Sequence, residues 1–445
     1  MKTKQLLAMI LAGMMTATAF AGCGGGGGTD QPSGDGGDGG DGGNSTALEV
    51  KENAIVDESV FGDEDNITLK VWAPEKAVDL TKKQIEDFKA AYPGKTFTNI
   101  EVVIQGEDSA ATQILNDAEQ AADVFGFASD QLNKLTDAGV IQEVAFVDYV
   151  TKTNVAETVT SATVNGKLYA FPETNDNGYY LVYDKSVVSD EQAKTLEGIL
   201  EGCKAAGRKF IFDSGSPFFA CTYAFTAGVK IDGFEEDGET QKFVDYDEDE
   251  AVATLQAFSK LMHDYKGTYA SLGAAQIASG FSTGTCGAGV DGSWNTVPDQ
   301  KALGDNYGAA KLPTINVNGT DKQLISMFGY KYIGVNAFSK FPRSAQILAL
   351  YLTGDKCQKE RTEEVGWGPS NLKVAGDEVV TSSPTLQAIT AQAQNAVPQV
   401  NIAPTLWDPM GNLGNKLIAD ETDPTDTEFF KKLLKETIVN VRDEA

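Results

Sequence analysis

Histidine is almost missing from this chain of 445 residues, which contains only His263. A single imidazole excludes multi-histidine metal sites and argues against Ser-His-Asp catalysis. His263 follows Leu261 and Met262 on an expected helix, where a surface or packing role is the natural interpretation. The composition therefore disfavours two common kinds of catalytic centre.

Basic residues are scarce, since 36 Lys and Arg face 64 Asp and Glu for a formal charge of −28. Such a surface repels nucleic acid and anionic lipid, so neither is an expected partner. Neither a phosphate-binding GxxxxGK loop nor EF-hand spacing occurs. The five acids within residues 245–250 fit a solvated turn between a strand and a helix. We therefore expect no cofactor and no metal.

Cysteine is also sparse, and no CxxC pair is present. Apart from Cys23, the chain has Cys203, Cys221, Cys286 and Cys357. Two disulfides outside the cell and four buried free thiols are both compatible with this spacing, which gives no connectivity.

The N-terminus has the pattern of an export signal. Lys2 and Lys4 precede an apolar stretch over residues 6–20, followed by the small residues Ala21 and Gly22. The stretch is too short to be a membrane-spanning element of the fold. We predict a signal peptide over residues 1–22.

The segment after the signal begins with Cys23 and is rich in Gly and Asp up to Gly43, a composition typical of a flexible tether. The small-small-Cys junction resembles that of bacterial lipoproteins, although Phe20 stands where Leu is usual. The resemblance implies lipidation of Cys23, a tether over residues 23–58, and attachment to the extracellular face of the cell membrane. The alternative is an ordinary secretory signal that is cut nearby and leaves Cys23 incidental.

The remaining part, roughly 390 residues, is longer than one core normally serves, so two lobes are expected. Alternating apolar residues over 67–71 predict a strand, and the apolar face of Ile85, Phe88 and Tyr92 predicts a helix. Strands are expected at 100–104 and 123–127, followed by a helix that ends at Gly139. This order indicates an α/β fold. Further strands are predicted at 168–171, 179–183, 209–212, 287–290 and 332–335, and helices near 190–206, 218–228, 248–265, 342–353, 355–364, 384–395, 409–419 and 427–441.

Seven segments are spread over residues 66–440: LKVWAPEK, ADVFGFASDQLNKLTDAGVIQEV, VNGKLYAFPE with LVYDKS, DGSWNT with NYGAAKLPTI, GVNAFSK, GPSNLKV and APTLWDPMGNL. In this order they resemble the extracellular solute-binding proteins of carbohydrate ABC importers, in the maltose/maltodextrin-binding branch. The resemblance implies a two-lobed periplasmic-binding-protein-like α/β fold, with crossing hinge strands and a ligand cleft that closes around substrate. We expect an N-terminal lobe over 59–172 plus 329–372 and a C-terminal lobe over 173–328 plus 373–445.

The same resemblance implies a set of sugar-binding residues, in which aromatic rings stack on the sugar and polar groups bind its hydroxyls. The polar group comprises Glu75, Lys76, Asp130, Gln131, and either Asp176 or Asn177. The aromatic group comprises Phe127, either Phe218 or Phe219, Trp294 and Trp407. Gln131 stands where relatives often have Arg, which leaves one charge-assisted contact in doubt.

The chemistry of these residue types supports the assignment independently. A pyranose has apolar C–H faces, which flat rings cover at low entropic cost, and a rim of hydroxyls that carboxylates and amides satisfy. Each well-buried hydrogen bond to a charged group contributes roughly 1.5–3 kcal/mol.

Structural roles are the alternative for several of these residues. Trp294 and Trp407 adjoin turn-forming residues, which favours ligand stacking, whereas Trp72 at a strand end is expected in the core. Trp367, between two glycines, is placed in a hinge-adjacent loop, with ligand contact as the alternative. Phe127 fits a core position as well as a platform, and Glu75 and Lys76 also fit a solvated helix start.

We therefore predict a monomeric, non-enzymatic substrate-binding lipoprotein that delivers malto-oligosaccharides to ABC permease subunits. One alternative is a secreted glycan hydrolase, which needs two acids about 5–10 Å apart, and no segment can be assigned as that pair. Incubation with maltoheptaose distinguishes the two, because only a hydrolase shortens it. The other alternative keeps the fold and binds a different oligosaccharide or a peptide, or senses sugar with a membrane kinase.

Overall fold

The computed structural model describes residues 48–235 and 237–442, and Val50–Ala445 is one compact unit. The predicted signal peptide and Cys23 lie outside the described residues. Within the described part, no helix is both long and apolar enough to span a bilayer.

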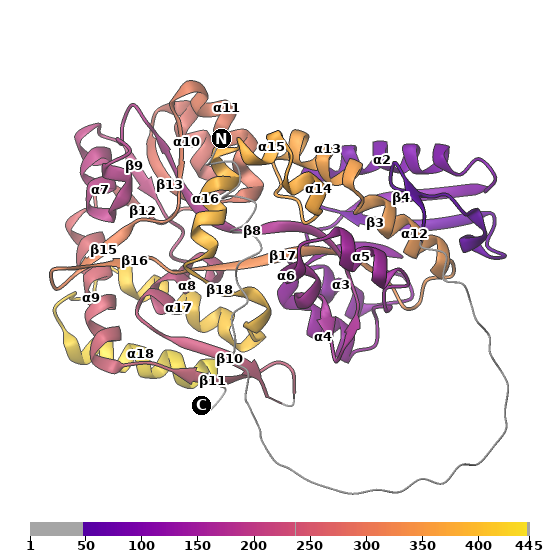
Figure 1. The fold of residues 1–445 in the computed structure, drawn as a ribbon. Coiled ribbons are helices and arrows are strands. Elements are labelled where there is room, and N and C mark those ends of the chain that lie inside the picture. The colour runs from indigo at the N-terminus through magenta and orange to yellow at the C-terminus, as the bar shows by residue number, and fades with distance from the viewer. Residues whose placement is uncertain (1–47, 236, 443–445) are drawn as a thin grey trace, which may run out of the picture. The chain divides into compact units, whose positions relative to one another are not determined.

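One sheet of ten strands organises the fold, in the order β12-β9-β13-β8-β17-β5-β3-β4, with β14 on β8 and β18 on β17. Its two long strands are β8 (Phe171–Asp184) and β17 (Ser326–Val335). The first half of β8 pairs with β17, and the second half pairs with β13 and β14. β8 and β17 therefore run between two groups of elements, as Figure 1 shows.

The first group of elements follows the pattern predicted from the sequence. It contains β3 (Ile67–Ala73), α2 (Val78–Ala91), β4 (Phe97–Ile104) and β5 (Val124–Ala128), which confirms the predicted strands and helix. The helix α3 (Ala110–Asn116) between β4 and β5 was missed, because its buried residues are only Ala110, Ala111 and Ile114. The parallel pairing of β3 with β4 and β5 confirms the α/β class.

The remaining elements of the first group are short or flank the crossing strands. They are α4 (Leu132–Asp137), α5 (Val147–Thr153), α6 (Ala156–Ser161), β6 (Thr163–Val164), β7 (Lys167–Leu168), α12 (Pro342–Leu352), α13 (Asp355–Val365), α14 (Leu372–Ala375) and α15 (Glu378–Thr381). The predicted helices at 342–353 and 355–364 are confirmed by α12 and α13.

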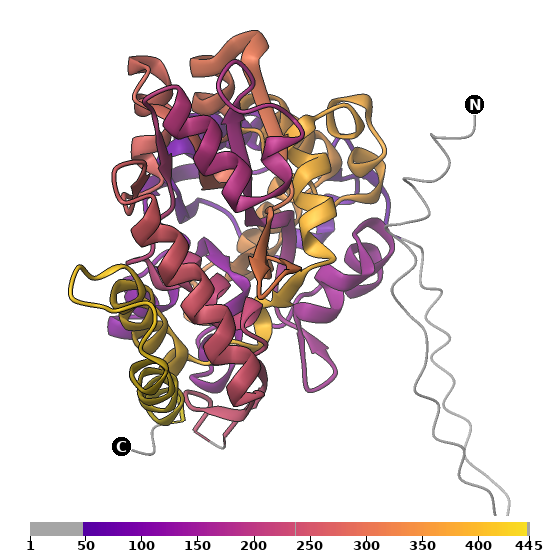
Figure 2. The same cartoon turned by 90° about the vertical axis from the view of Figure 1, so that its left-hand side faces the viewer.

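The second group of elements lies at the other end of β8 and β17 in Figure 1. Its strands are β9 (Lys209–Ile211), β10 (Lys230–Phe234), β11 (Gln241–Asp245), β12 (Tyr269–Ala270), β13 (Cys286–Gly292), β14 (Tyr307–Ala310), β15 (Thr314–Val317), β16 (Thr320–Gln323) and β18 (Ala396–Pro398). Its helices are α7 (Leu196–Ala205), α8 (Pro217–Thr226), α9 (Glu248–Asp264), α10 (Ala275–Thr283), α11 (Thr296–Leu303), α16 (Pro384–Ala393), α17 (Trp407–Ile418) and α18 (Thr427–Val441). Figure 2 shows α9 crossing this side of the molecule next to α18.

The folded part begins earlier than the predicted end of the tether at residue 58. β1 (Val50–Lys51) pairs with β2 (Ala54–Ile55). The buried Asn53 side chain donates to the Tyr351 carbonyl oxygen at 3.0 Å, and the Ile55 amide donates to the Tyr92 hydroxyl at 2.7 Å. These contacts fix residues 50–55 on α2 and α12, so the predicted tether boundary is corrected to about residue 50. The predicted lobe boundaries themselves stay a prediction.

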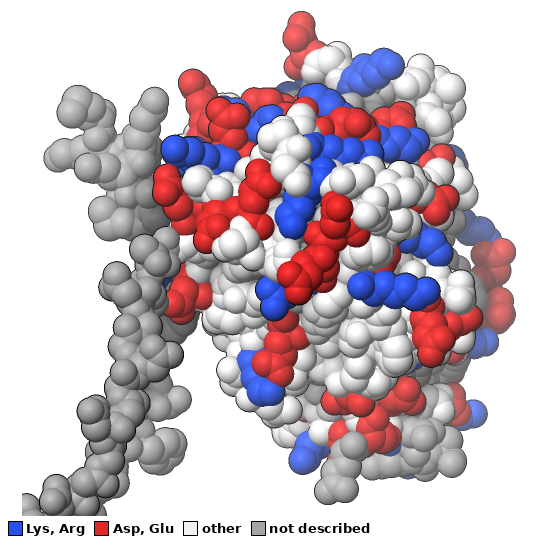
Figure 3. Space-filling view, turned by 90° about the vertical axis from the view of Figure 1, so that its right-hand side faces the viewer, with Lys and Arg blue, Asp and Glu red and all other residues white. Residues whose placement is uncertain are grey.

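Charged side chains of both signs alternate on the outer surface in Figure 3, which views the side of the first group. The first group contains ion pairs between surface side chains. Lys83 lies 3.4 Å from Glu364, and Lys89 lies 2.8 Å from Glu86. Exposed pairs of this kind contribute little to stability. The negative net charge therefore does not produce a face of one sign in this view.

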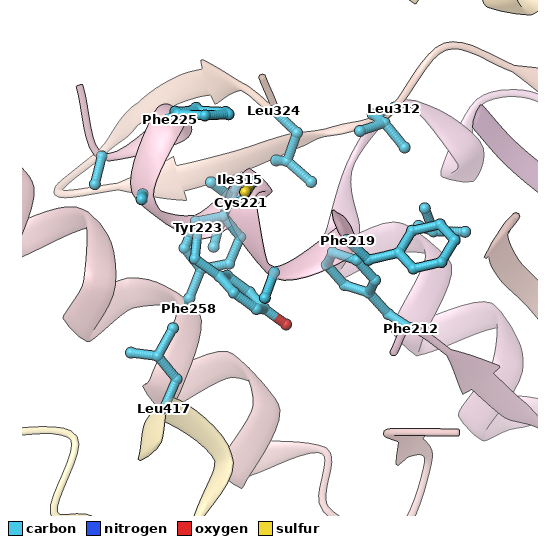
Figure 4. Packing of buried hydrophobic residues seen from close by; sticks show 14 of the residues in the cluster. Phe212, Phe219, Cys221, Tyr223, Phe225, Phe258, Leu312, Ile315, Leu324 and Leu417 are labelled. Carbon is cyan, nitrogen blue, oxygen red and sulfur yellow. The ribbon is translucent and has the colours of Figure 1, made fainter. Parts of the chain in front are cut away.

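The largest core lies in the second group, between α8, α9, α17 and α18. Figure 4 shows its central side chains, including Phe212, Phe219, Tyr223 and Phe258. His263 belongs to this framework, because its ring nitrogens lie 2.7 Å from the Ser259 carbonyl oxygen and 3.1 Å from that of Ala419. This is the packing role expected for His263.

The four cysteines within the described residues are buried, and Trp72 is partly buried. Cys203, Cys221, Cys286 and Cys357 are all buried free thiols, which is one of the two alternatives left open. Burial raises the pKa of each of these thiols. Trp72 is half-buried at the end of β3, so it is only partly in the core.

Close packing of α17 on α8 depends on Gly414. A methyl group at Gly414 would lie 1.9 Å from the Ser214 carbonyl oxygen and 2.9 Å from the Ala220 Cβ. We expect Gly414→Ala to lower the free energy of unfolding by about 1–3 kcal/mol, the usual cost of overpacking. Gly376→Ala is the control, because a methyl group there meets no atom closer than 3.7 Å. Equal urea midpoints for both variants would contradict this account.

Candidate functional site

The two groups of elements contact each other through Lys76, beside the crossing strands. Lys76 lies in the short helix η2 (Glu75–Ala77), at the start of α2. Its Nζ donates to the Trp294 carbonyl oxygen at 3.0 Å and to Asn295 Oδ1. Trp294 and Asn295 belong to η5 (Ser293–Asn295), which follows β13. The predicted residues Lys76 and Trp294 are therefore brought together.

Aromatic rings gather at the same place. The Phe218 ring lies 5.7 Å from the half-buried Trp294 ring, measured between centroids. A methyl group at Gly292 would lie 2.2 Å from the Trp294 indole, so only glycine leaves room for this ring. The observed position of the Trp294 ring therefore requires glycine at position 292.

A buried ion pair lies next to these rings. Lys331 Nζ, on β17, lies 2.6 Å from Glu107 Oε2, and both side chains are less than 10% exposed. The same ammonium lies 4.5 Å from the centroid of the Trp367 ring and 5.7 Å from that of Trp294. These are distances for cation–π attraction. The pair thus joins a loop of the first group to a crossing strand and two indoles.

The backbone of β17 explains how a lysine reaches this position. The register between β17 and β8 shifts on both sides of Lys331, where Gly329, Lys331 and Tyr332 pair irregularly. Such bulges re-aim a side chain relative to a regular strand. Burial acts to lower the pKa of Lys331, but the charges of Glu107 and Asp176 outweigh it and raise the pKa. Lys331 is therefore a stable cation.

Asp176, on β8, forms one polar cluster with Glu107, Lys331 and Trp367. These four residues are the Lys331 cluster. Its Oδ2 accepts a hydrogen bond from the Gly368 amide at 2.6 Å, and the side chain is fully buried. A methyl group at Gly368 would lie 2.7 Å from the Asp176 Cβ, so the close approach requires glycine. Burial raises the pKa of Asp176, opposed by the Gly368 hydrogen bond and by Lys331.

Gln399 links two more predicted residues, Asp130 and Asn177. Its Nε2 donates to Asp130 Oδ1 at 2.9 Å, and its Oε1 accepts from Asn177 Nδ2 at 2.7 Å. A methyl group at Gly329 would lie 2.1 Å from Gln399 Oε1, so this side chain passes directly over β17. Burial raises the pKa of Asp130 to about 6.

Three predicted residues have structural surroundings instead. Phe127 is fully buried between the rings of Phe125 and Tyr332, at centroid distances of 5.6 and 5.7 Å, and offers no face to a sugar. Gln131 accepts from the Ala111 amide at 2.8 Å and donates to the Glu107 carbonyl oxygen at 2.5 Å. Its amide therefore holds the loop that carries Glu107.

Phe219 is the third, since it belongs to the core shown in Figure 4. Of the two predicted alternatives, Phe218 is the ring that lies near Trp294. Glu75 is exposed at the start of η2, and Trp407 is half-buried at the start of α17, against the same core. Within the described residues, neither makes a hydrogen bond, ion pair or ring contact with Glu107, Asp176, Lys331 or Trp367.

Sequence reasoning missed Glu107, Lys331 and Gln399, and it placed Trp367 in a loop with ligand contact as the alternative. Lys331 carried a signal, because it is a single charge within the otherwise uncharged segment 326–337. Glu107 and Gln399 carried none, since each acquires its role only through residues far away in the sequence.

A second acidic group lies behind Trp294. Asp291 Oδ1 accepts from Asn295 Nδ2 at 2.7 Å, and the buried carboxyl group of Asp299, on α11, interacts electrostatically with Asp291. Two neighbouring buried carboxylates repel each other, which favours keeping a proton on one of them. Burial raises the pKa of both groups above the ordinary 3.8. The pair therefore retains a proton that the unfolded chain releases.

This proton predicts a pH dependence of stability. Because the folded state binds the proton and the unfolded state loses it near pH 3.8, stability falls as pH rises above that value. We expect the melting temperature to fall between pH 6 and pH 9, and to fall less in Asp299→Asn, whose amide replaces the shared proton. The difference corresponds to at least about 1 kcal/mol. Asp305→Asn, at an exposed position, is the control, and identical slopes in all three proteins would contradict the shared proton.

The fold and these contacts define a two-lobed α/β binding protein with crossing strands. A model of the family described as bacterial extracellular solute-binding protein matches residues 83–388. The chain belongs to this family. A galactooligosaccharide-binding protein of Bacillus subtilis (strain 168) is 28% identical over 389 residues, which cover 84% of this chain and 89% of the relative.

Solved structures agree with the family. A chain solved with acarbose superposes with a TM-score of 0.75 at 25% identity, covering 85% of this chain and 99% of that one. A maltodextrin-binding protein from L. casei BL23, solved without ligand, gives a TM-score of 0.69 at 24% identity, covering 84% and 99%. The predicted family and fold class are thereby confirmed.

Proposed function

We propose that this protein captures neutral oligosaccharides, with malto-oligosaccharides as the preferred class, and delivers them to an ABC permease without changing them chemically. The observation that supports this most is the meeting of Trp294, Trp367 and Phe218 with the polar groups of Lys331, Glu107 and Asp176 at the crossing strands. Rings and hydroxyl-binding groups in one place suit a sugar.

Lobe closure couples binding to transport in this proposal. Lys76 and Trp294 come from different groups of elements, so their 3.0 Å contact requires the groups to be close together. A sugar that contacts both groups binds this state more tightly than an open one and shifts the population toward it. The closed form is then the one that docks on the permease.

Galacto-oligosaccharides are the second candidate ligand, because a relative that is 28% identical is named for binding them. Both classes are chains of neutral hexoses and differ in the orientation of hydroxyls and in linkage. A calorimetric panel of malto- and galacto-oligosaccharides, with xylo- and cello-oligosaccharides as controls, separates the two.

Stacking on indoles predicts a specific loss. We expect Trp294→Ala or Trp407→Ala to weaken binding of the best oligosaccharide by about 1–3 kcal/mol, since each removes a large ring. Phe243→Ala is the control, because that ring is 47% exposed on β11. Calorimetry that gave wild-type affinity for both tryptophan variants would remove the stacking model.

Attachment to the membrane is proposed to depend on Cys23. In cells, Cys23→Ala should move the protein from the membrane fraction to the medium, because the acylated residue is lost. The purified variant should bind sugar as the wild type does, since the folded part is unchanged. Retention of Cys23→Ala in the membrane fraction would contradict lipidation at this residue.

A further inference from the structure

The cluster around Lys331 contains buried polar atoms that lack partners within the described residues. Glu107 Oε1 and Trp367 Nε1 are each inaccessible and make no hydrogen bond there. Asp176 Oδ1 is also inaccessible and has no hydrogen bond of normal geometry, although the hydroxyls of Thr174 and Ser293 are near enough to act on its pKa. The other oxygen of each carboxylate is used, by Lys331 in one case and by the Gly368 amide in the other. Each carboxylate is thus half-satisfied, and the single indole N–H of Trp367 is unpaired.

Such groups are costly, since a buried polar atom without a partner destabilises a fold by about 1–3 kcal/mol. Three of them surround one ammonium, at the point where the strand register is irregular. Folding alone gives no reason to collect them there. Their arrangement is that of a site completed by another molecule.

The atoms also match one kind of ligand. The free oxygens of Glu107 and Asp176 accept hydrogen bonds, whereas Trp367 Nε1 donates and Lys331 has donors beyond the one used by Glu107. Two neighbouring hydroxyls of a sugar ring donate twice and accept at least twice, so they can satisfy all four groups.

Charge limits the ligand further. Three buried carboxylates, Glu107, Glu173 and Asp176, face two buried cations, Lys331 and Arg361. Arg361 is already engaged, with its Nε 3.1 Å from Glu173 Oε1. Lys76, beside Trp294, supplies a third cation, so the charges balance and a neutral ligand leaves this balance unchanged.

We propose that Glu107, Asp176, Lys331 and Trp367 form a subsite for one neutral sugar ring, whose adjacent hydroxyls bind Glu107 Oε1, Asp176 Oδ1, Lys331 Nζ and Trp367 Nε1. This inference rests on the proposed function, keeps Asp176 from the set predicted from the sequence, and assigns ligand contact to Glu107, Lys331 and Trp367, which lie outside that set. It also makes the Lys331–Glu107 pair part of recognition.

The test uses variants that keep the volume of the side chain. Glu107→Gln removes the charge at the subsite, and Trp367→Phe removes the indole N–H while keeping a ring. Maltotetraose and β-1,4-galactotetraose are the calorimetric probes, with the tighter one used throughout. We expect each variant to bind about 10- to 100-fold more weakly, as for a lost hydrogen bond to a charged or buried group. The control is Lys83→Met, at a surface pair of the first group.

A deoxy series separates contact from a purely structural role. If Glu107 binds a hydroxyl, the tetrasaccharide analogue that lacks this hydroxyl should bind to the wild type and to Glu107→Gln with equal affinity. The contact between Glu107 and the hydroxyl is then missing from both complexes. Melting temperatures identify any variant that fails to fold. If Glu107→Gln fails to fold, Trp367→Phe supplies the test.

The outcomes are distinct for the two proposals. Wild-type affinity in both variants, together with sugar binding by the wild type, overturns the subsite and leaves the proposed function standing. A loss that is the same for every deoxy analogue also overturns the subsite, because it indicates a structural effect. A wild-type protein that binds neither tetrasaccharide overturns the proposed function itself.

Discussion

The pairing of β8 with β17 is the constraint on which the rest of the structure depends. These two strands are the neighbours at the middle of the ten-stranded sheet, and each continues into pairing with strands of a different group. Asp176 and Asn177 lie on β8, and Lys331 lies on β17, so the polar cluster is built on the connection itself. A change in the relative position of the two groups must therefore alter the surroundings of these side chains.

Much of the fold follows from local patterns that act over a few residues. The alternation over 67–71 and the apolar face of α2 require only neighbours in the chain, and both are present in the structure. The missed helices α3 and α10 show the limit, because small residues such as Ala and Gly give weak periodicity. Pattern reasoning succeeds where large side chains mark one face.

The site was less predictable, for a physical reason. Resemblance places a residue at a position in the chain, but Phe127 is enclosed by Phe125 and Tyr332, and Gln131 is occupied by the loop of Glu107. Whether a ring is a platform or core depends on what covers it, which a sequence does not state. The position of Lys331 depends on the bulge in β17, on the loop that carries Glu107 and on Trp367. These come from three segments that are distant in the sequence, so no local pattern predicts the position.

The half-satisfied groups connect stability to function. On the proposed function, an open form would let water pair with the free atoms of Glu107, Asp176 and Trp367, which would remove the cost of burying them unpaired. Closing without ligand buries these atoms unpaired, whereas closing around hydroxyls pairs them. The same side chains that weaken an empty closed form therefore strengthen a loaded one. On the proposed function, this difference makes the closed form depend on bound sugar. A cluster of apolar residues at the same place would favour closure with or without ligand.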